Sequence, residues 1–105
     1  VIVGAAWNIS STHPLNVKFV DDYTKKYNRP PDQFAAQAFA GVHIAYQAAK
    51  AAGTADNRKA IRDAMLKLKG LDTLLGKFSF TEGRDADHSP VVQEVKGGKF
   101  AVFGN

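Results

Sequence analysis

Acidic, imidazole and hydroxyl side chains gather in one short stretch, residues 83–89, which reads GRDADHS. Asp, His and Ser are the side chains of a hydrolytic triad, but a triad is assembled in space, and side chains adjacent in sequence point apart. Asp85 and Asp87 are spaced like the start of a calcium loop, yet the glycine and the closing glutamate of such a loop are missing at the required offsets. The stretch therefore favours a polar turn over a catalytic or metal-binding site.

The remaining candidates for metal or nucleophile chemistry are isolated. His13 and His43 have no suitable second ligand three or four residues away. The chain has no cysteine, which excludes disulfides and thiolate metal sites. Neither a phosphate loop nor the pattern G-x-G-x-x-G is present. We therefore expect a protein that is not an enzyme and that holds no metal and no cofactor.

Composition predicts one globular unit and argues against two classes of partner. The 105 residues are 45% apolar, which suits a single domain-sized unit. The net charge of +4 comes from 14 basic and 10 acidic residues without a run of five like charges, so nucleic acid is not an expected partner. No apolar run approaches the ~20 residues that span a bilayer, and we expect a soluble chain.

Hydrophobic periodicity and turn residues predict how the chain begins. Residues 1–6 are apolar throughout, as in a strand buried on both faces, and a loop follows over residues 7–13. A first helix starts at Pro14, with Thr12 or His13 as its cap, and ends before the Pro-Pro pair at 30–31. Its predicted buried face is Leu15, Phe19, Val20, Tyr23 and Tyr27.

The second predicted helix is the longest and the most apolar. It begins at about Asp32 and ends at Gly53, a residue suited to a left-handed cap. Two apolar rows run along it at helical spacing: Phe34, Ala38, Val42, Ala45 and Ala49, and Ala35, Phe39, Val42, Tyr46 and Ala49. Small residues between large aromatic ones let another backbone approach closely, so the rows predict a deeply buried helix in a larger body.

A third helix and a β-rich end complete the predicted elements. Asp56 caps the helix, Gly70 ends it, and its apolar face is Ile61, Ala64, Met65 and Leu68. Residues 78–81 alternate as a strand, and 82–85 form a turn. Strands at 91–96 and 99–103 flank a Gly-Gly pair, which is a strong hairpin signal. The aromatic residues that we assign to the core are Tyr23, Tyr27, Phe39, Tyr46, Phe78 and Phe80.

The order of these elements and of four short motifs resembles a known family. The motifs are Tyr27-Asn28 before the turn RPPD, the cap AGTAD at 52–56, the strand GKFSFTEGRD at 76–85, and the hairpin VQEVKGGKF at 92–100. Together they are similar to the periplasmic solute-binding proteins of ABC importers, of the branched-chain amino acid type. The resemblance covers nearly the whole chain, although no single motif is diagnostic.

The resemblance implies a fold and a domain organisation. It implies an α/β chain that is the C-terminal fragment of a two-lobe, type I periplasmic-binding-protein fold, with a strand, three helices, and a C-terminal β-strand and hairpin. Residues 1–105 would form a single unit, and the N-terminal two thirds of the protein would be absent. The apolar opening strand with no lead-in agrees with a fragment.

The resemblance also implies a function. Two lobes would close over a small solute, an amino acid or a related carboxylate that includes aromatic ones, and the closed form would deliver it to an ABC permease in the membrane. The protein would be periplasmic. Its other partner would be the missing N-terminal part or a second copy of this fragment, because isolated apolar faces and open strand edges favour association.

Four residues are candidates for contact with the solute. On the family's pattern, Phe34 packs against the solute, and Gln37 adds an amide contact one turn later. Trp7 and Asn8 lie where the chain leaves the first strand near the cleft. Each residue also fits a structural role: Phe34 in the core, Gln37 in solvent, Trp7 over a sheet edge with its indole N–H on a carbonyl, and Asn8 in a turn.

Two other functions stay open at this point. The same lobes serve as ligand-binding sensor domains in receptors and regulators, which a fused transmembrane or output segment would reveal. A self-standing α+β interaction module is the third reading, which a folded and monomeric chain would favour.

Overall fold

The computed structural model describes residues 1–104 of the chain. These residues form three helices and six strands. In chain order they are β1 (Ile2–Ala5), α1 (Pro14–Tyr27), α2 (Gln33–Ala52), α3 (Arg58–Lys67), β2 (Leu71–Thr73), β3 (Gly76–Phe80), β4 (Ala86–Asp87), β5 (Val91–Lys96) and β6 (Lys99–Val102).

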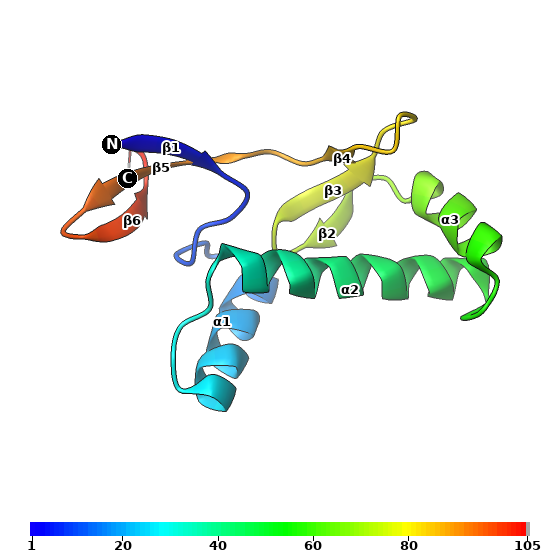
Figure 1. Ribbon diagram of the computed structural model, residues 1–105, viewed down its shortest axis with the longest axis horizontal. Coiled ribbons are helices and arrows are strands. Elements are labelled where there is room, and N and C mark those ends of the chain that lie inside the picture. The colour runs from blue at the N-terminus through cyan, green and yellow to red at the C-terminus, as the bar shows by residue number, and fades with distance from the viewer. Residues whose placement is uncertain (105) are drawn as a thin grey trace.

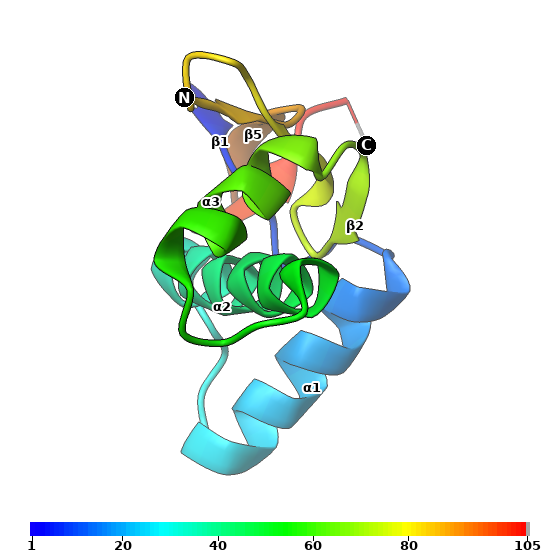
Figure 2. The same ribbon diagram turned by 90° about the vertical axis from the view of Figure 1, so that its right-hand side faces the viewer.

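The long helix α2 is the axis of the molecule, and the other elements are distributed along it (Figure 1). Near its N-terminus lie α1 and the chain that leads to β1, the strands β2 to β4 lie beside its first half and middle, and α3 lies at its C-terminal end. Seen along α2, helices α1 and α3 lie on different sides of it (Figure 2). The chain is therefore elongated, with extents of 48 × 31 × 19 Å.

The strands form two small antiparallel sheets. One has the order β1-β5-β6 and the other the order β2-β3-β4. In the first sheet Ile2 pairs with Glu94, so the two ends of the chain meet there. In the β5–β6 hairpin, Gly97 and Gly98 have φ values of 57° and 76°, which confirms the predicted Gly-Gly turn.

The helix ends follow local signals in the sequence. His13 caps α1, and Asp32 caps α2 by accepting the N–H of Ala35 at 2.8 Å. Gly53 ends α2 with a φ of 71°. The prediction for α3 was wrong in its bounds: Asn57 is the cap in place of Asp56, and the helix ends at Lys67 before Gly70. Asp56 is engaged instead with the hydroxyl of Thr54.

The core is small and lies where α1, α2 and the β2–β3 turn meet. It consists of Trp7, Phe19, Ala36, Ala40 and Leu74. The side chains of Phe19 and Trp7 meet edge to face, with ring centroids 6.5 Å apart. Val20 and Tyr23 of the predicted α1 face pack against this core, whereas Leu15 and Tyr27 are exposed.

The predicted burial of α2 was wrong about which side is covered. Its buried row consists of three alanines and one isoleucine, Ala36, Ala40, Ile44 and Ala48, and α1, α3 and β2 pack on this side. The rows that contain Phe34, Phe39, Val42 and Tyr46 face outwards, and the side chain of Val42 is 72% exposed. An apolar residue lies on nearly every side of this helix, so periodicity could not select the packed face.

The first strand also differs from its prediction. Ile2 and Val3 are exposed, because the β1-β5-β6 sheet lies apart from the helices (Figure 1) and neither face of β1 is covered. The short strands β2 and β4 were not predicted. Of the aromatic residues assigned to the core, Phe78 is buried, Tyr23 and Phe80 are half-buried, and Tyr27, Phe39 and Tyr46 are exposed.

Candidate functional site

The four predicted site residues lie on two segments that the fold brings together. Trp7 and Asn8 follow β1, and Phe34 and Gln37 lie in the first two turns of α2. The two segments meet through a hydrogen bond in which the N–H of Ala6 donates to Oε1 of Gln33 at 3.0 Å. The end of β1 therefore adjoins the beginning of α2, although 27 residues separate the bonded pair.

Phe34 is the predicted site residue most open to a ligand. Its side chain is 75% exposed at the first turn of α2, directly after the residue that bonds to Ala6. Gln37 is exposed one turn further on. An exposed aromatic ring beside a fixed helix start offers an apolar surface that a small solute can cover.

Trp7 is largely enclosed in the core. It is 6% exposed, and its indole N–H donates to Oδ1 of Asn16 at 2.5 Å. This is the structural role that the sequence offered as its alternative, with a side-chain amide oxygen in place of a backbone carbonyl. Its contact with a solute stays a prediction.

Asn8 is buried and fully engaged. Its Nδ2 donates to Oε1 of Gln93 at 2.7 Å, and its Oδ1 accepts from the backbone N–H and the hydroxyl of Ser10. Asn8 is 2% exposed. Its side chain stabilises a turn and links the segment after β1 to β5. In the arrangement described, its polar atoms are used by the protein itself.

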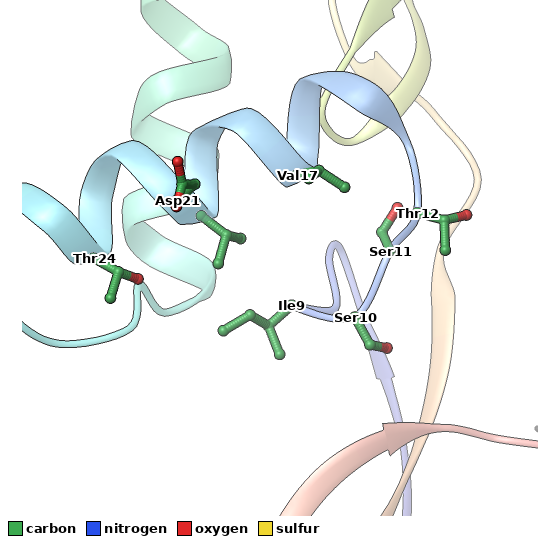
Figure 3. Close-up of a pocket in the computed structure, with 8 residues that line it drawn as sticks. Ile9, Ser10, Ser11, Thr12, Val17, Asp21 and Thr24 are labelled. Atoms are coloured by element: carbon green, nitrogen blue, oxygen red, sulfur yellow. The ribbon is translucent and has the colours of Figure 1, made fainter.

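Of two hollows in the described part of the chain, one includes a predicted site residue. The larger, of about 440 Å³, lies between the loop after Asn8 and α1, and Figure 3 shows Ile9 and Ser10 on the loop side and Val17 on the helix. Asp21 at its edge is bonded to Lys25 at 2.9 Å. The smaller hollow, of about 300 Å³, lies between α2, α3 and the β2-β3-β4 sheet, and Gln37 lines it.

The acidic and imidazole groups do not assemble a metal centre. Within residues 1–104, no group of three or more His, Cys, Asp or Glu side chains could hold a metal ion. His13 lies 3.0 Å from Oδ1 of Asp72, and this contact holds the pKa of the Asp72 carboxyl below its ordinary value. His88 stacks on Phe78 with ring centroids 5.9 Å apart.

Sequence reasoning missed three amide side chains that organise this region. Asn16, Gln33 and Gln93 each accept a hydrogen bond from one of residues 6–8. A signal was present, because Gln93 is a polar residue inside the strand pattern VVQEV, and Asn16 interrupts the apolar side of α1. Their partners lie far along the chain, which no local pattern reveals.

Comparison with known proteins decides the family. The model of the family described as periplasmic binding protein matches residues 1–99. The chain belongs to the periplasmic binding protein family. Its α/β elements fit a segment of the type I periplasmic-binding-protein fold, which confirms the predicted family and fold class.

Solved structures of the family superimpose on almost the entire chain. A leucine binding protein from Thermotoga maritima has a TM-score of 0.83 and 24% identity over 97% of this chain. The substrate-binding protein of a branched-chain amino acid transporter from Streptococcus pneumoniae, solved in complex with isoleucine, has 0.80 and 28% over 94%. A solute binding protein of an R. palustris ABC transporter, in complex with benzoate, has 0.85 and 24% over 99%.

The matched region is a limited part of those proteins. The chain spans 29%, 28% and 29% of the Thermotoga, Streptococcus and R. palustris proteins, respectively. A comparison with curated proteins found no match. None of the helices in residues 1–104 combines the length and the apolar character needed to cross a membrane. The family is one of solute-binding proteins, and the Streptococcus and R. palustris relatives are the binding proteins of transporters.

Proposed function

We propose that this chain is the C-terminal part of the extracytoplasmic solute-binding component of an ABC transporter. The protein binds a small amino acid or a related carboxylate, aromatic ones included, between two lobes and delivers it to a membrane permease. The structural relatives support this proposal, because their names describe leucine, isoleucine and benzoate as ligands. The three share a carboxylate attached to an apolar group.

The observation that carries the proposal is the position of Phe34. At 75% exposure, Phe34 is the most exposed aromatic side chain among residues 1–104. It projects from the first turn of α2, beside the point where the chain leaves β1. An apolar side chain of leucine or the ring of benzoate is a chemically matched cover.

The exposed side of α2 supports the second part of the proposal, a larger protein. Phe39, Val42 and Tyr46 are all more than half exposed, although the ring of Phe39 also contacts that of Phe19 with centroids 4.9 Å apart. The solved relatives are more than three times as long as this chain. We propose that the N-terminal two thirds of the same protein covers this side of α2 and supplies the other lobe.

The test uses the longer protein that contains this chain. Leucine, isoleucine and benzoate are each titrated into it, and calorimetry measures the heat of binding. We expect binding of at least one of the three. Phe34→Ala should weaken it by about 10- to 100-fold, since burying a phenyl ring against a ligand contributes on the order of 1.5–3 kcal/mol. The matched control is Tyr27→Ala, which removes another exposed aromatic ring from the far end of α1.

Two results would contradict the proposal. Absence of heat with all three solutes, in a protein shown to be folded, would reject the solute class. Equal affinity of the wild type and the Phe34→Ala variant would reject the role of Phe34 and leave the solute-binding function to other residues.

A further inference from the structure

Three successive residues, 6–8, are each held by a carboxamide side chain from a different element. The pairs are Ala6 with Gln33 of α2, Trp7 with Asn16 of α1, and Asn8 with Gln93 of β5. We call these six residues the amide junction. It lies where the β1-β5-β6 sheet joins the helices, so it fixes how these two parts of the molecule are oriented.

Burial strengthens the hydrogen bonds of the amide junction. Asn16 is fully buried, and Asn8 and Gln93 are buried nearly as well. Hydrogen bonds in such surroundings are stronger than in water, and an unpaired group there is costly. Because carboxamides do not ionise, this geometry is independent of pH, unlike the contact between His13 and Asp72.

Gln33 is the member of the amide junction closest to the proposed solute contact. It is the first residue of α2, and Phe34 follows it directly. Its Oε1 accepts the backbone N–H of Ala6 at 3.0 Å. This hydrogen bond links the first turn of α2 to the end of β1. It therefore also fixes the direction in which the Phe34 side chain points relative to β1.

We propose that Gln33 is a positioning residue, which holds the first turn of α2, and so Phe34, in one orientation relative to β1. Its effect on solute affinity rests on the proposed function. The claim about orientation rests only on this chain. Gln33 acts through its acceptor oxygen, so Glu, which keeps an oxygen at that place, should replace it, and Met, which has a similar length and no such acceptor, should not.

The first experiment measures hydrogen exchange of the Ala6 amide by NMR in the longer protein that contains this chain. We expect Gln33→Met to speed exchange at Ala6 by about fivefold, which corresponds to loss of one hydrogen bond of about 1 kcal/mol. Gln33→Glu should leave it near the wild-type rate. Gln47→Met is the matched control, because Gln47 lies in the same helix and bonds to His43 instead.

The second experiment measures orientation and binding. Residual dipolar couplings of the α2 amides against those of β1 should change in Gln33→Met and be restored in Gln33→Glu. In the longer protein, calorimetry with leucine, isoleucine and benzoate should show weaker binding in Gln33→Met, again by about fivefold, and wild-type affinity in Gln33→Glu.

Each outcome has a separate meaning. Unchanged Ala6 exchange and couplings in Gln33→Met would overturn the positioning role. Changed couplings with unchanged solute affinity would overturn its link to binding while the orientation claim stands. A wild-type protein that binds none of the three solutes would reject the proposed function alone, and the exchange rates and couplings would still decide the role of Gln33.

Discussion

The imidazole of His13 joins α1 to the β2–β3 hairpin, because its Nε2 lies 3.0 Å from Oδ1 of Asp72, 59 residues away. The other ring nitrogen, Nδ1, accepts the N–H of Leu15 and caps the helix. With Nδ1 as the acceptor of the Leu15 N–H, Nε2 is the ring nitrogen that faces Asp72. The Nζ of Lys77 lies 3.5 Å from the same carboxylate oxygen of Asp72.

This contact predicts a dependence of stability on pH. The pKa of Asp72 is lowered, first by the hydrogen bond from His13 and then by the charge of Lys77. A folded-state pKa below the unfolded one, about 3.9, stabilises the fold above pH 4, and this contribution is lost as the pH falls through the folded-state value. Asp72→Asn should therefore unfold at a slightly lower temperature at pH 7, and the difference should shrink in acid. Thermal unfolding at pH 7, 5 and 3 checks this, and an equal difference at all three would contradict it.

Asn16 should be among the residues most sensitive to substitution. It accepts from the indole of Trp7 and donates to the carbonyls of Ile9 and Ser11, with no exposed surface. Asn16→Ala leaves these groups unpaired and should lower the free energy of unfolding by about 2–4 kcal/mol. Urea unfolding followed by the fluorescence of Trp7 measures the loss.

The control for Asn16 is Val17→Ala. Val17 is its neighbour in α1, and its side chain is more than half exposed. The substitution should change stability by less than about 0.5 kcal/mol. Similar losses in the two variants would show that the buried amide has no special role.

A glycine inside α2 and the glycine that caps its C-terminus should respond in opposite directions to alanine. Gly53 has a φ of 71°, so a Cβ there is strained by about 1 kcal/mol although it meets no neighbour. Gly41 lies inside the helix with open space around its Cβ, and Gly41→Ala should stabilise by about 0.5–1 kcal/mol. Urea unfolding of both variants tests this pair, and a shift of both in the same direction would contradict it.

The exposed side of α2 should cause the chain to associate at high concentration. Val42 is surrounded by further exposed apolar residues on this side, among them Phe39 and Tyr46. We expect Val42→Lys to reduce association, with little change in unfolding. Sedimentation velocity over a range of concentrations checks this. Lys50→Gln, on an exposed residue in the last turn of the same helix, is the control. Equal association of Val42→Lys and the wild type would place the contact elsewhere.

Local signals predicted much of the fold. A capping residue before Pro14, Asp32 ahead of the long helix, Gly53 after it and the Gly-Gly turn all act through their immediate neighbours. The family followed from the order of such elements, and the match over residues 1–99 confirms it. Of the site residues, only the exposure of Phe34 and Gln37 agrees with an open binding surface.

Features that depend on distant partners were not predictable. The packed side of α2 depends on where α1, α3 and β2 lie, and the helix is apolar on nearly every side. The bonds of Trp7 to Asn16 and of Asn8 to Gln93, which hold both residues inside the protein, were not predicted. Neither partner could be identified from residue spacing, because a hydrogen bond between residues 8 and 93 produces no periodic pattern in the sequence.

The pairing of β1 with β5 has a consequence for how this chain folds. Ile2 meets Glu94 in register, so nearly all of the chain forms the loop that this contact closes. Closing such a loop costs on the order of 4 kcal/mol of chain entropy, whereas α1, α2 and the β5–β6 hairpin need only neighbours. During synthesis β1 is made before β5, so β1 has no partner strand until β5 follows. Docking of β1 should therefore be the slowest step of folding, and its edge is open to wrong partners until then.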